Sequence, residues 1–503
     1  MPPSLLRRLD PYSAEPLASG APPRPITYVG DQVLVRGMAG RQEPLAALAR
    51  VAAARGVEVV DAHPGRVGRE LAANDRLARR LERSWATTVR LGDRSGRPVD
   101  AWPIVQEARR SSPRLAPQLQ LNHVLALAGP EYQGMPYYVS MPYYVSMPYY
   151  VSMPYYVSMP AEDYTRPGSG GRSPVAMVLP DPALRARSMA RPPLVVVLDT
   201  ALGHHPWFAD SATATDEVYA RGLRLGLGGD VPAVAAPAAA QDRLDGRVAS
   251  HAGHATFIAG IVRQTCPEAR IQVVPLLDDA GTMPEDALIQ VLNLLLLRQL
   301  DALAGNGPAE DLIDVLSLSL GYYHEDPDDQ LEDAPLRIVL EGLGRAGVAV
   351  VASAGNQSTT DRLYPAAFAG QTLPGFSPDL VPLVSVGALN PDGNTVAYFS
   401  NGGDWVSCHR AGAALVSTVP IDLDGELQAS AAHVHGSQHR ATIDPENFRG
   451  GFAAWSGTSF AGPVLAGQLA ARIGEHALAA RVDQASAVAR SWAAVTAELG
   501  WAP

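Results

Sequence analysis

Ser459 is the most informative residue of the chain, because its surroundings suit a nucleophile. It follows the small-residue turn Gly457-Thr458, and a helical stretch over 464–473 comes shortly after it. A helix N-terminus offers free backbone N–H groups and the positive end of the helix dipole, which can stabilise an attacking oxygen and a nearby oxyanion. Close helix packing by small residues would explain this segment taken alone. A nucleophilic role for Ser459 becomes the better explanation because the rest of the chain supplies the partners that such a serine needs.

Three upstream segments carry those partners. A β-branched apolar run over 194–198 ends in Asp199, which predicts a buried parallel strand with a carboxylate at its C-terminal edge. His254 opens an apolar helix, and a second buried strand over 348–351 leads into a turn that ends at Asn356. A serine hydroxyl becomes nucleophilic when a neutral imidazole takes its proton, and a buried carboxylate stabilises the resulting imidazolium without any metal. The pattern indicates acyl transfer by an activated serine.

The order Asp, His, Asn, Ser, spread over residues 174–475, resembles that of the subtilisin-like serine proteases, or subtilases. The resemblance implies that Ser459 is the nucleophile, His254 the general base and Asp199 the group that orients the imidazole. It also implies that the Asn356 amide and the Ser459 backbone N–H donate to the oxyanion. The implied activity is that of a serine endopeptidase, which hydrolyses peptide bonds through an acyl-enzyme.

The resemblance further implies where a peptide substrate would bind. A peptide would add as an extra strand to an exposed edge, with side-chain pockets supplying specificity. The residues expected to bind it are Ser319, Leu320 and Gly321 in one segment and Ser353, Ala354 and Gly355 in another.

Three positions depart from the family pattern. Ala201 and Ala255 stand where glycine is usual, and Tyr322 follows Gly321 where a second small residue is common. Each adds bulk near the expected substrate site without removing a reacting group. Two alternatives to a protease therefore stay open. One is a catalytically degenerate subtilase that binds peptide, and the other is a peptide-processing transpeptidase that passes its acyl group to an amine.

Buried strands and helices alternate between residues 194 and 473, which predicts an α/β fold with a subtilisin-like parallel sheet and helices on both faces. Catalytic groups at strand C-termini and helix N-termini suit such a sheet. A small α+β N-terminal domain precedes it, with strands expected at 32–36, 57–60 and 122–128 and helices at 43–55 and 70–85. Surface insertions are expected at 209–250 and 421–450.

The expected division of the chain has five parts. The N-terminal α+β domain either acts as a propeptide or is a separate recognition domain, and the final helix could pack on the core or mediate association, with packing favoured. The parts are a proline-rich, poorly ordered N-terminus (1–24), the α+β domain (25–130), a repeat and linker (131–173), the peptidase domain (174–475) and a C-terminal helix (476–503).

Met135–Ser158 consists of four consecutive copies of Met-Pro-Tyr-Tyr-Val-Ser. A six-residue period matches no globular repeat class, and a proline in every copy prevents a continuous helix. We expect a flexible tether that arose by duplication. The alternative is that one extended copy competes for the substrate site from within the chain.

The composition narrows the choice of partners. A net charge of −11 argues against nucleic acid and against an anionic membrane, which leaves a peptide or protein substrate. No segment reaches the roughly 18 apolar residues of a membrane span, and no signal peptide is apparent, so a cytoplasmic location is expected. The two cysteines, Cys266 and Cys408, suggest no disulfide framework. The oligomeric state stays open.

No cofactor and no metal centre are expected. The histidines at 204–205, 251 and 254 could form a zinc cluster, but the helical His-Glu-x-x-His spacing is absent. Structural calcium at the acidic segments 278–279 or 326–329 is possible, although no ligands can be assigned. Acidic surface loops are more often simply solvated.

Overall fold

A parallel sheet organises the C-terminal two thirds of the chain. The computed structural model describes residues 5–38, 42–63, 65–93, 96–127, 171–176, 179–232, 241, 246–277, 281–371, 375–475 and 482–503. The strands of this sheet are β7 (Leu194–Asp199), β8 (Ala214–Thr215), β11 (Arg270–Pro275), β13 (Val315–Leu318), β15 (Ala349–Ser353), β17 (Val384–Leu389) and β18 (Cys408–Ala411). Their order is β18-β17-β15-β13-β7-β11-β8, with every neighbouring pair parallel.

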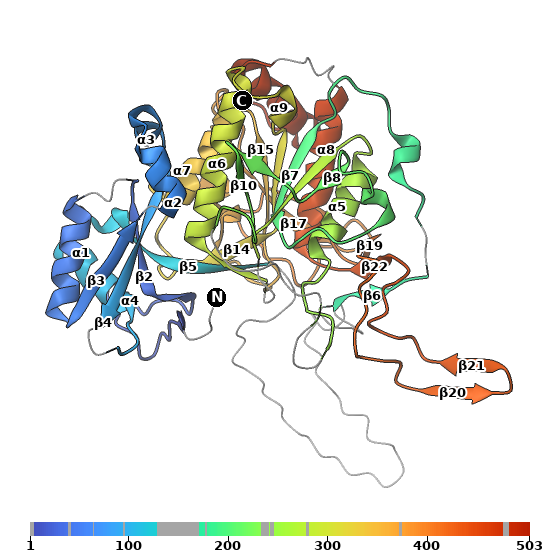
Figure 1. The fold of residues 1–503 in the computed structure, drawn as a ribbon, viewed down its shortest axis with the longest axis horizontal. Helices are drawn as coiled ribbons and strands as arrows, with labels where there is room; N and C mark the ends of the chain where they lie inside the picture. Colours follow the sequence, from blue (N-terminus) through green and yellow to red (C-terminus); the bar gives the residue numbers. More distant parts are fainter. Residues whose placement is uncertain are drawn as a thin grey trace, which may run out of the picture.

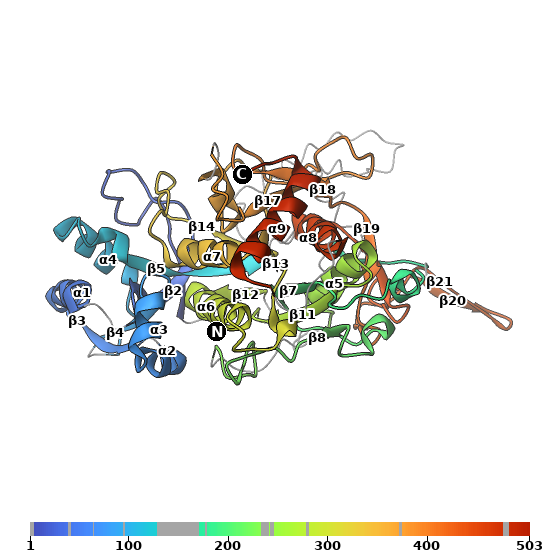
Figure 2. The same ribbon diagram turned by 90° about the horizontal axis from the view of Figure 1, so that it is seen from above.

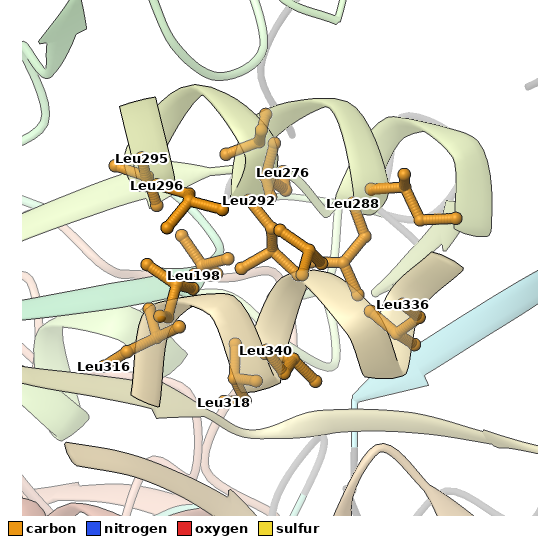
Figure 3. Close-up of a cluster of buried hydrophobic side chains, with 14 of the residues drawn as sticks. Leu198, Leu276, Leu288, Leu292, Leu295, Leu296, Leu316, Leu318, Leu336 and Leu340 are labelled. Atoms are coloured by element: carbon orange, nitrogen blue, oxygen red, sulfur yellow. The ribbon is translucent and has the colours of Figure 1, made fainter. Parts of the chain in front are cut away.

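Helices cover both faces of the parallel sheet, as the sequence predicts (Figures 1 and 2). The alternation of side chains along β7 divides the core, because successive residues of a strand point to opposite faces. Val195 and Val197 pack with α5 (His254–Thr265) and α8 (Thr458–Glu475). Leu198 packs with α6 (Glu285–Leu303) and α7 (Pro335–Arg345) in a leucine-rich layer (Figure 3). The predicted α/β architecture is confirmed.

The small N-terminal α+β domain is also present (Figure 1). Its antiparallel sheet has the order β5-β2-β4-β3, with β1 beside β2. Its elements are β1 (Leu6–Arg8), β2 (Thr27–Arg36), α1 (Gln42–Ala54), β3 (Val57–His63), α2 (Gly65–Ala72), α3 (Asp75–Leu81), β4 (Ala86–Asp93), α4 (Ala101–Ser111) and β5 (Leu119–Leu127).

The N-terminal segment differs from its prediction. Its proline content predicts a poorly ordered segment over residues 1–24, yet from residue 5 onward the chain forms β1 and a run of turns. Leu9 and Leu17 are buried in the hydrophobic core of the small domain. These two apolar anchors hold the proline-rich segment against the sheet.

Strand β5 belongs to both parts of the molecule (Figure 1). Its first half pairs with β2, and its last residues pair antiparallel with β12 (Thr282–Pro284) on one side and β14 (Leu320–Tyr323) on the other. Strand β16 (Leu363–Tyr364) continues this sheet beyond β14. The N-terminal domain and the larger part are therefore joined by one continuous sheet.

The remaining elements are peripheral. Helix α9 (Gln484–Leu499) packs on the core through residues such as Trp492, as expected for the final helix. Strands β20 (Ala432–His435) and β21 (Gln438–Ala441) form an exposed hairpin within the predicted insertion 421–450 (Figure 1). The other short strands are β6 (Ser173–Pro174), β9 (Tyr219–Ala220), β10 (Leu223–Arg224), β19 (Leu415–Thr418) and β22 (Phe452–Trp455). The Met135–Ser158 repeat lies outside the described residues, so its interpretation as a tether stays a prediction.

The leucine-rich layer yields a stability prediction. Leu292 lies in this layer with none of its surface exposed (Figure 3), so Leu292→Ala should lower the free energy of unfolding by about 2–5 kcal/mol. Leu184 is 81% exposed, and Leu184→Ala should change that free energy by less than about 0.5 kcal/mol. Denaturant unfolding followed by circular dichroism measures both. Similar losses in the two variants would contradict this description of the core.

Candidate active site

Asp199 and His254 form a buried hydrogen-bonded pair. Asp199 ends β7, His254 begins α5, and both are buried. The Nδ1 atom of His254 lies 2.8 Å and 2.9 Å from the two carboxylate oxygens of Asp199. The Asp199 carboxylate also accepts the backbone N–H of Thr200 at 2.7 Å. Because the carboxylate accepts the hydrogen bond of the Nδ1–H group, the neutral imidazole keeps a lone pair at Nε2, and Nε2 makes no hydrogen bond in the structure.

Ser459 lies in the first turn of α8, directly before Phe460, whose ring contacts the imidazole. The His254 ring packs against Phe460 with 5.1 Å between ring centroids and against Trp455 with 5.4 Å. These two aromatic residues flank the turn that carries Ser459, so the N-termini of α5 and α8 meet here. Nε2 of His254 is not hydrogen-bonded to the Ser459 hydroxyl. Such bonds are often long without substrate and shorten when substrate binds.

The orientation of the Asn356 amide is fixed by Thr458. The Oδ1 atom of Asn356 accepts the backbone N–H and the hydroxyl of Thr458, each at 2.8 Å. The amide Nδ2 is consequently turned away from Thr458, and it is buried without a hydrogen bond. A Cβ atom at Gly457 would lie 3.3 Å from Nδ2, so glycine at this position leaves room beside the donor.

The segment 353–355, expected to bind substrate, contacts the first turn of α8. The Ser353 hydroxyl donates to the Thr458 carbonyl at 2.9 Å, and the Gly355 N–H donates to the Thr458 hydroxyl at 3.0 Å. Ala354 is buried, and its carbonyl accepts the side-chain amide of Asn401 at 2.9 Å. These contacts give the segment a positioning role for the turn that carries Ser459.

The second expected substrate segment lies against a strand of the chain itself. Ser319 is buried, and its hydroxyl donates to the Ser459 carbonyl at 3.0 Å. Leu320 and Gly321 begin β14 and pair with Leu127 and Ala126 of β5. The backbone edge that a peptide would use is thus paired with β5. On its other side β5 pairs with β12, which has only three residues and therefore no clear pattern in the sequence.

The three departures from the family pattern are accommodated. Neither Ala201 nor Ala255 has a positive φ, so neither position requires glycine for its backbone conformation. A Cβ atom at Gly203 would lie 2.2 Å from the Pro420 side chain, which places the close approach two residues later than the usual glycine. The Tyr322 hydroxyl donates to the buried Glu285 carboxylate at 3.1 Å.

The acidic segment 326–329 makes local hydrogen bonds of the kind found in surface turns. Asp326 and Asp329 of the proposed calcium segment accept backbone N–H groups from Asp328 and Leu331, at 3.0 Å and 2.8 Å. The segment 278–279 lies outside the described residues. Cys266 and Cys408 are both free thiols. In the part of the chain that the structure describes, no helix is both long and apolar enough to cross a membrane.

The model of the subtilase family matches residues 191–497 of this chain. The chain belongs to the subtilase family. The matched span contains Asp199, His254, Asn356 and Ser459. The protein is accordingly a serine endopeptidase of the subtilisin-like type, and its substrates are peptides or proteins.

Similar solved structures include three proteases of low sequence identity. A cold-adapted subtilisin-like serine proteinase is 17% identical, with a TM-score of 0.36, and the alignment covers 61% of this subtilase and 82% of that chain. A lanthipeptide protease is 19% identical, with a TM-score of 0.35 and coverage of 56% and 73%. The prenylagaramide maturation protease PagA is 19% identical, with a TM-score of 0.33 and coverage of 56% and 76%. No curated protein sequence matches the chain.

Proposed function

We propose that Asp199, His254 and Ser459 act as a catalytic triad that hydrolyses peptide bonds through an acyl-enzyme. The observation that carries this proposal is the buried Asp199–His254 pair, which leaves Nε2 unpaired beside the turn of Ser459. Nε2 takes the Ser459 proton as the hydroxyl oxygen attacks the substrate carbonyl, and it returns that proton to the leaving amine. Asp199 holds the tautomer and stabilises the imidazolium. In the second step Nε2 takes a proton from water as the water oxygen attacks the acyl carbonyl, and it returns that proton to the Ser459 oxygen as the acid product leaves.

The proposed oxyanion donors are the Asn356 amide and the backbone N–H of Ser459. Both lie at the N-terminus of α8, where the positive end of the helix dipole also favours a developing negative charge. The support for Asn356 is its unpaired, buried Nδ2, because a buried donor without a partner costs free energy unless another state of the molecule uses it.

The unpaired Nε2 and Nδ2 atoms favour an active protease over a degenerate subtilase that only binds peptide. A fluorophosphonate probe separates the two, since it labels only an activated serine. A transpeptidase would also be labelled, but its product would carry an added amine where a protease leaves a free carboxylate. Mass spectrometry of products formed with and without an added amine distinguishes these activities.

We also propose that the N-terminal domain, residues 25–130, is a propeptide-like inhibitor of the peptidase domain, residues 174–475. The supporting observation is the pairing of Ala126 and Leu127 with the β14 edge that a substrate would use. Leu125 is fully buried and packs in the core cluster that contains Met283 and Leu320. An inhibitory strand of this kind lowers activity by competing with peptides for the same backbone edge.

Removal of any triad side chain should abolish turnover. Ser459→Ala and His254→Ala should each lower kcat by roughly a millionfold, with little further loss in the double variant, a magnitude known for subtilisin and borrowed here from the family. Steady-state cleavage of an added peptide measures kcat. The control is Ser430→Ala, an exposed serine outside the proposed site, which should behave as the wild type. Activity retained by Ser459→Ala would refute the assignment.

Two substitutions at Asn356 separate its donor role from its contact with Thr458. Asn356→Leu loses both, whereas Asn356→Asp keeps an oxygen for Thr458 and loses the N–H donor. If the amide stabilises the oxyanion, both variants should lower kcat by roughly a hundredfold or more, with KM little changed. Wild-type kcat in the Asp variant would show that Asn356 only positions α8.

Weakening the β5 contact should activate the enzyme toward added peptides. Leu125→Ala removes buried side-chain atoms from the segment that pairs with β12 and β14, so kcat/KM should rise several-fold. The matched control is Val60→Ala, which truncates an apolar side chain that is 59% exposed on β3. An unchanged kcat/KM in Leu125→Ala would argue that β5 does not compete with substrate.

A further inference from the structure

A cluster of side chains that could ligate a metal ion lies where the N-terminal domain meets the peptidase domain. His123 comes from β5, and His324 and Glu325 directly follow β14. All three side chains are buried, with exposed fractions of 1%, 2% and 0%. One ligand atom from each residue lies within 4.8 Å of the other two. We call these three residues the His123 cluster.

Three atoms of this cluster converge. The Nε2 atom of His123 lies 2.7 Å from Oε2 of Glu325, and the Nε2 atom of His324 lies 3.3 Å from the same oxygen. Imidazole nitrogens and carboxylate oxygens are the donors that zinc and similar ions bind in proteins. Calcium and magnesium prefer six or more oxygen ligands, which this cluster does not offer.

The remaining polar atom of each residue has its own partner. Nδ1 of His123 lies 2.7 Å from the Glu285 carboxylate, and Oε1 of Glu325 accepts the Arg109 guanidinium at 3.0 Å. Nδ1 of His324 lies 3.1 Å from the backbone carbonyl of Asp326. Metal ligands in proteins are usually oriented by such outer hydrogen bonds. Nδ1 of His324 also lies 3.2 Å from the backbone nitrogen of Asp326. Both Nδ1 atoms therefore have partners outside the cluster, and the two Nε2 atoms face the same Glu325 oxygen.

His324 supplies an independent observation. Its Nε2 atom is buried and makes no hydrogen bond in the structure, although Nδ1 is well partnered. A buried ring nitrogen without a hydrogen bond is uncommon. Its 3.3 Å contact with the Glu325 carboxylate is an ion pair only when the ring is protonated. For the neutral ring, coordination of a cation by Nε2 would offset the desolvation cost.

We propose that His123 Nε2, His324 Nε2 and Glu325 Oε2 bind one divalent transition metal ion of the zinc class. Coordination uses the lone pair of His123 Nε2, so the proton that this nitrogen shares with Glu325 is released to solvent as the ion enters. The carboxylates of Glu285 and Glu325 balance the charge of the ion, and a water completes a tetrahedral site.

The bound ion would fasten β5 to the peptidase. His123 belongs to the N-terminal domain, whereas both other ligands belong to the loop after β14. The residue after His123 is Val124, which pairs with Pro284 of β12, and three residues further Leu127 pairs with Leu320. This consequence rests on the proposed inhibitory role of β5. Under that role the ion holds the inhibitory strand on the substrate edge.

The first experiment measures binding in full-length Ser459→Ala protein, so that it needs no catalysis. Metal-free protein is titrated with Zn²⁺ by calorimetry, and Co²⁺ is used as a visible-absorption probe. One tight ion per chain with a tetrahedral Co²⁺ spectrum is expected. His324→Gln should weaken the affinity by at least tenfold, and Glu285→Gln, which disturbs the outer contact of His123, by roughly ten- to a hundredfold. Circular dichroism confirms that the compared variants are folded.

The matched control is His433→Gln, on the exposed β20–β21 hairpin. This variant should bind Zn²⁺ with the same affinity as the parent Ser459→Ala protein. Absence of a stoichiometric ion, or equal affinity in the folded His324→Gln and control proteins, would overturn the site. If both substitutions at His324 and Glu285 unfold the protein, the Co²⁺ spectrum of the parent protein still decides, since a spectrum without imidazole-type tetrahedral bands rejects the site.

The second experiment tests, in the active enzyme, whether the bound ion holds β5 on the substrate edge. Metal-loaded protein should cleave an added peptide with a several-fold lower kcat/KM than metal-free protein, and His324→Gln should remove this dependence. Tight binding in Ser459→Ala protein without any metal effect on kcat/KM would overturn only the proposal that the ion holds β5 on the substrate edge. Failure of the wild type to cleave any peptide would instead refute the proposed function and leave the binding result intact.

Discussion

The position of the α8 N-terminus is the constraint on which the rest of the site depends. Its first turn is held by hydrogen bonds from three directions: the Ser319 hydroxyl, the Ser353 hydroxyl and the Asn356 amide. These residues follow or end neighbouring strands of the parallel sheet. Close approach of the helix to β15 is possible because Gly462 has no side chain, and a Cβ atom there would lie 2.9 Å from the Ser353 hydroxyl. The sheet thereby sets where Ser459 stands relative to His254.

Much of this arrangement could be predicted from the sequence because parallel strands are buried on both faces. Such strands appear as short, largely apolar runs, so β7, β13, β15 and their following helices can be identified. Asp199, His254, Asn356 and Ser459 could then be placed at element ends. The finer roles could not. The segment 353–355 is expected to contact substrate, but its hydrogen bonds to Thr458 join residues about a hundred positions apart and have no local signal.

Local signals that predict helix boundaries were present but missed. The expected helix over 70–85 is two helices, because the Asn74 side chain accepts the N–H groups of Arg76 and Leu77 and starts α3. Helix α4 was not anticipated, although Asp100 caps it in the same way. Asparagine and aspartate at these positions were the available signals. The short strands β12 and β14 have no comparable signal, since their pairing with β5 depends on residues far away in the sequence.

The His123 cluster was beyond sequence reasoning for a similar reason. His123 and His324 are separated by two hundred positions, and nothing in either local sequence resembles a ligand motif. Only the passage of β5 into the peptidase sheet brings them together. The histidines that sequence reasoning considered for metal, at 204–205, 251 and 254, lie in other surroundings. His205, for example, packs among Trp207, Phe208 and Phe452, and burial there lowers its pKa to about 4.

Two adjacent residues contact the β5 strand on one side and Ser459 on the other. Leu320 pairs with β5, and the preceding Ser319 donates its hydroxyl to the Ser459 carbonyl. A strand that leaves this edge exposes the Leu320 and Gly321 backbone groups, whose hydrogen bonds must then be made by water or by a peptide. A peptide that replaces β5 restores that pairing one residue from the contact to Ser459. Replacement of β5 by a peptide keeps these backbone groups paired throughout, whereas opening of the edge to solvent leaves them to water, so replacement is the less costly route for a substrate strand.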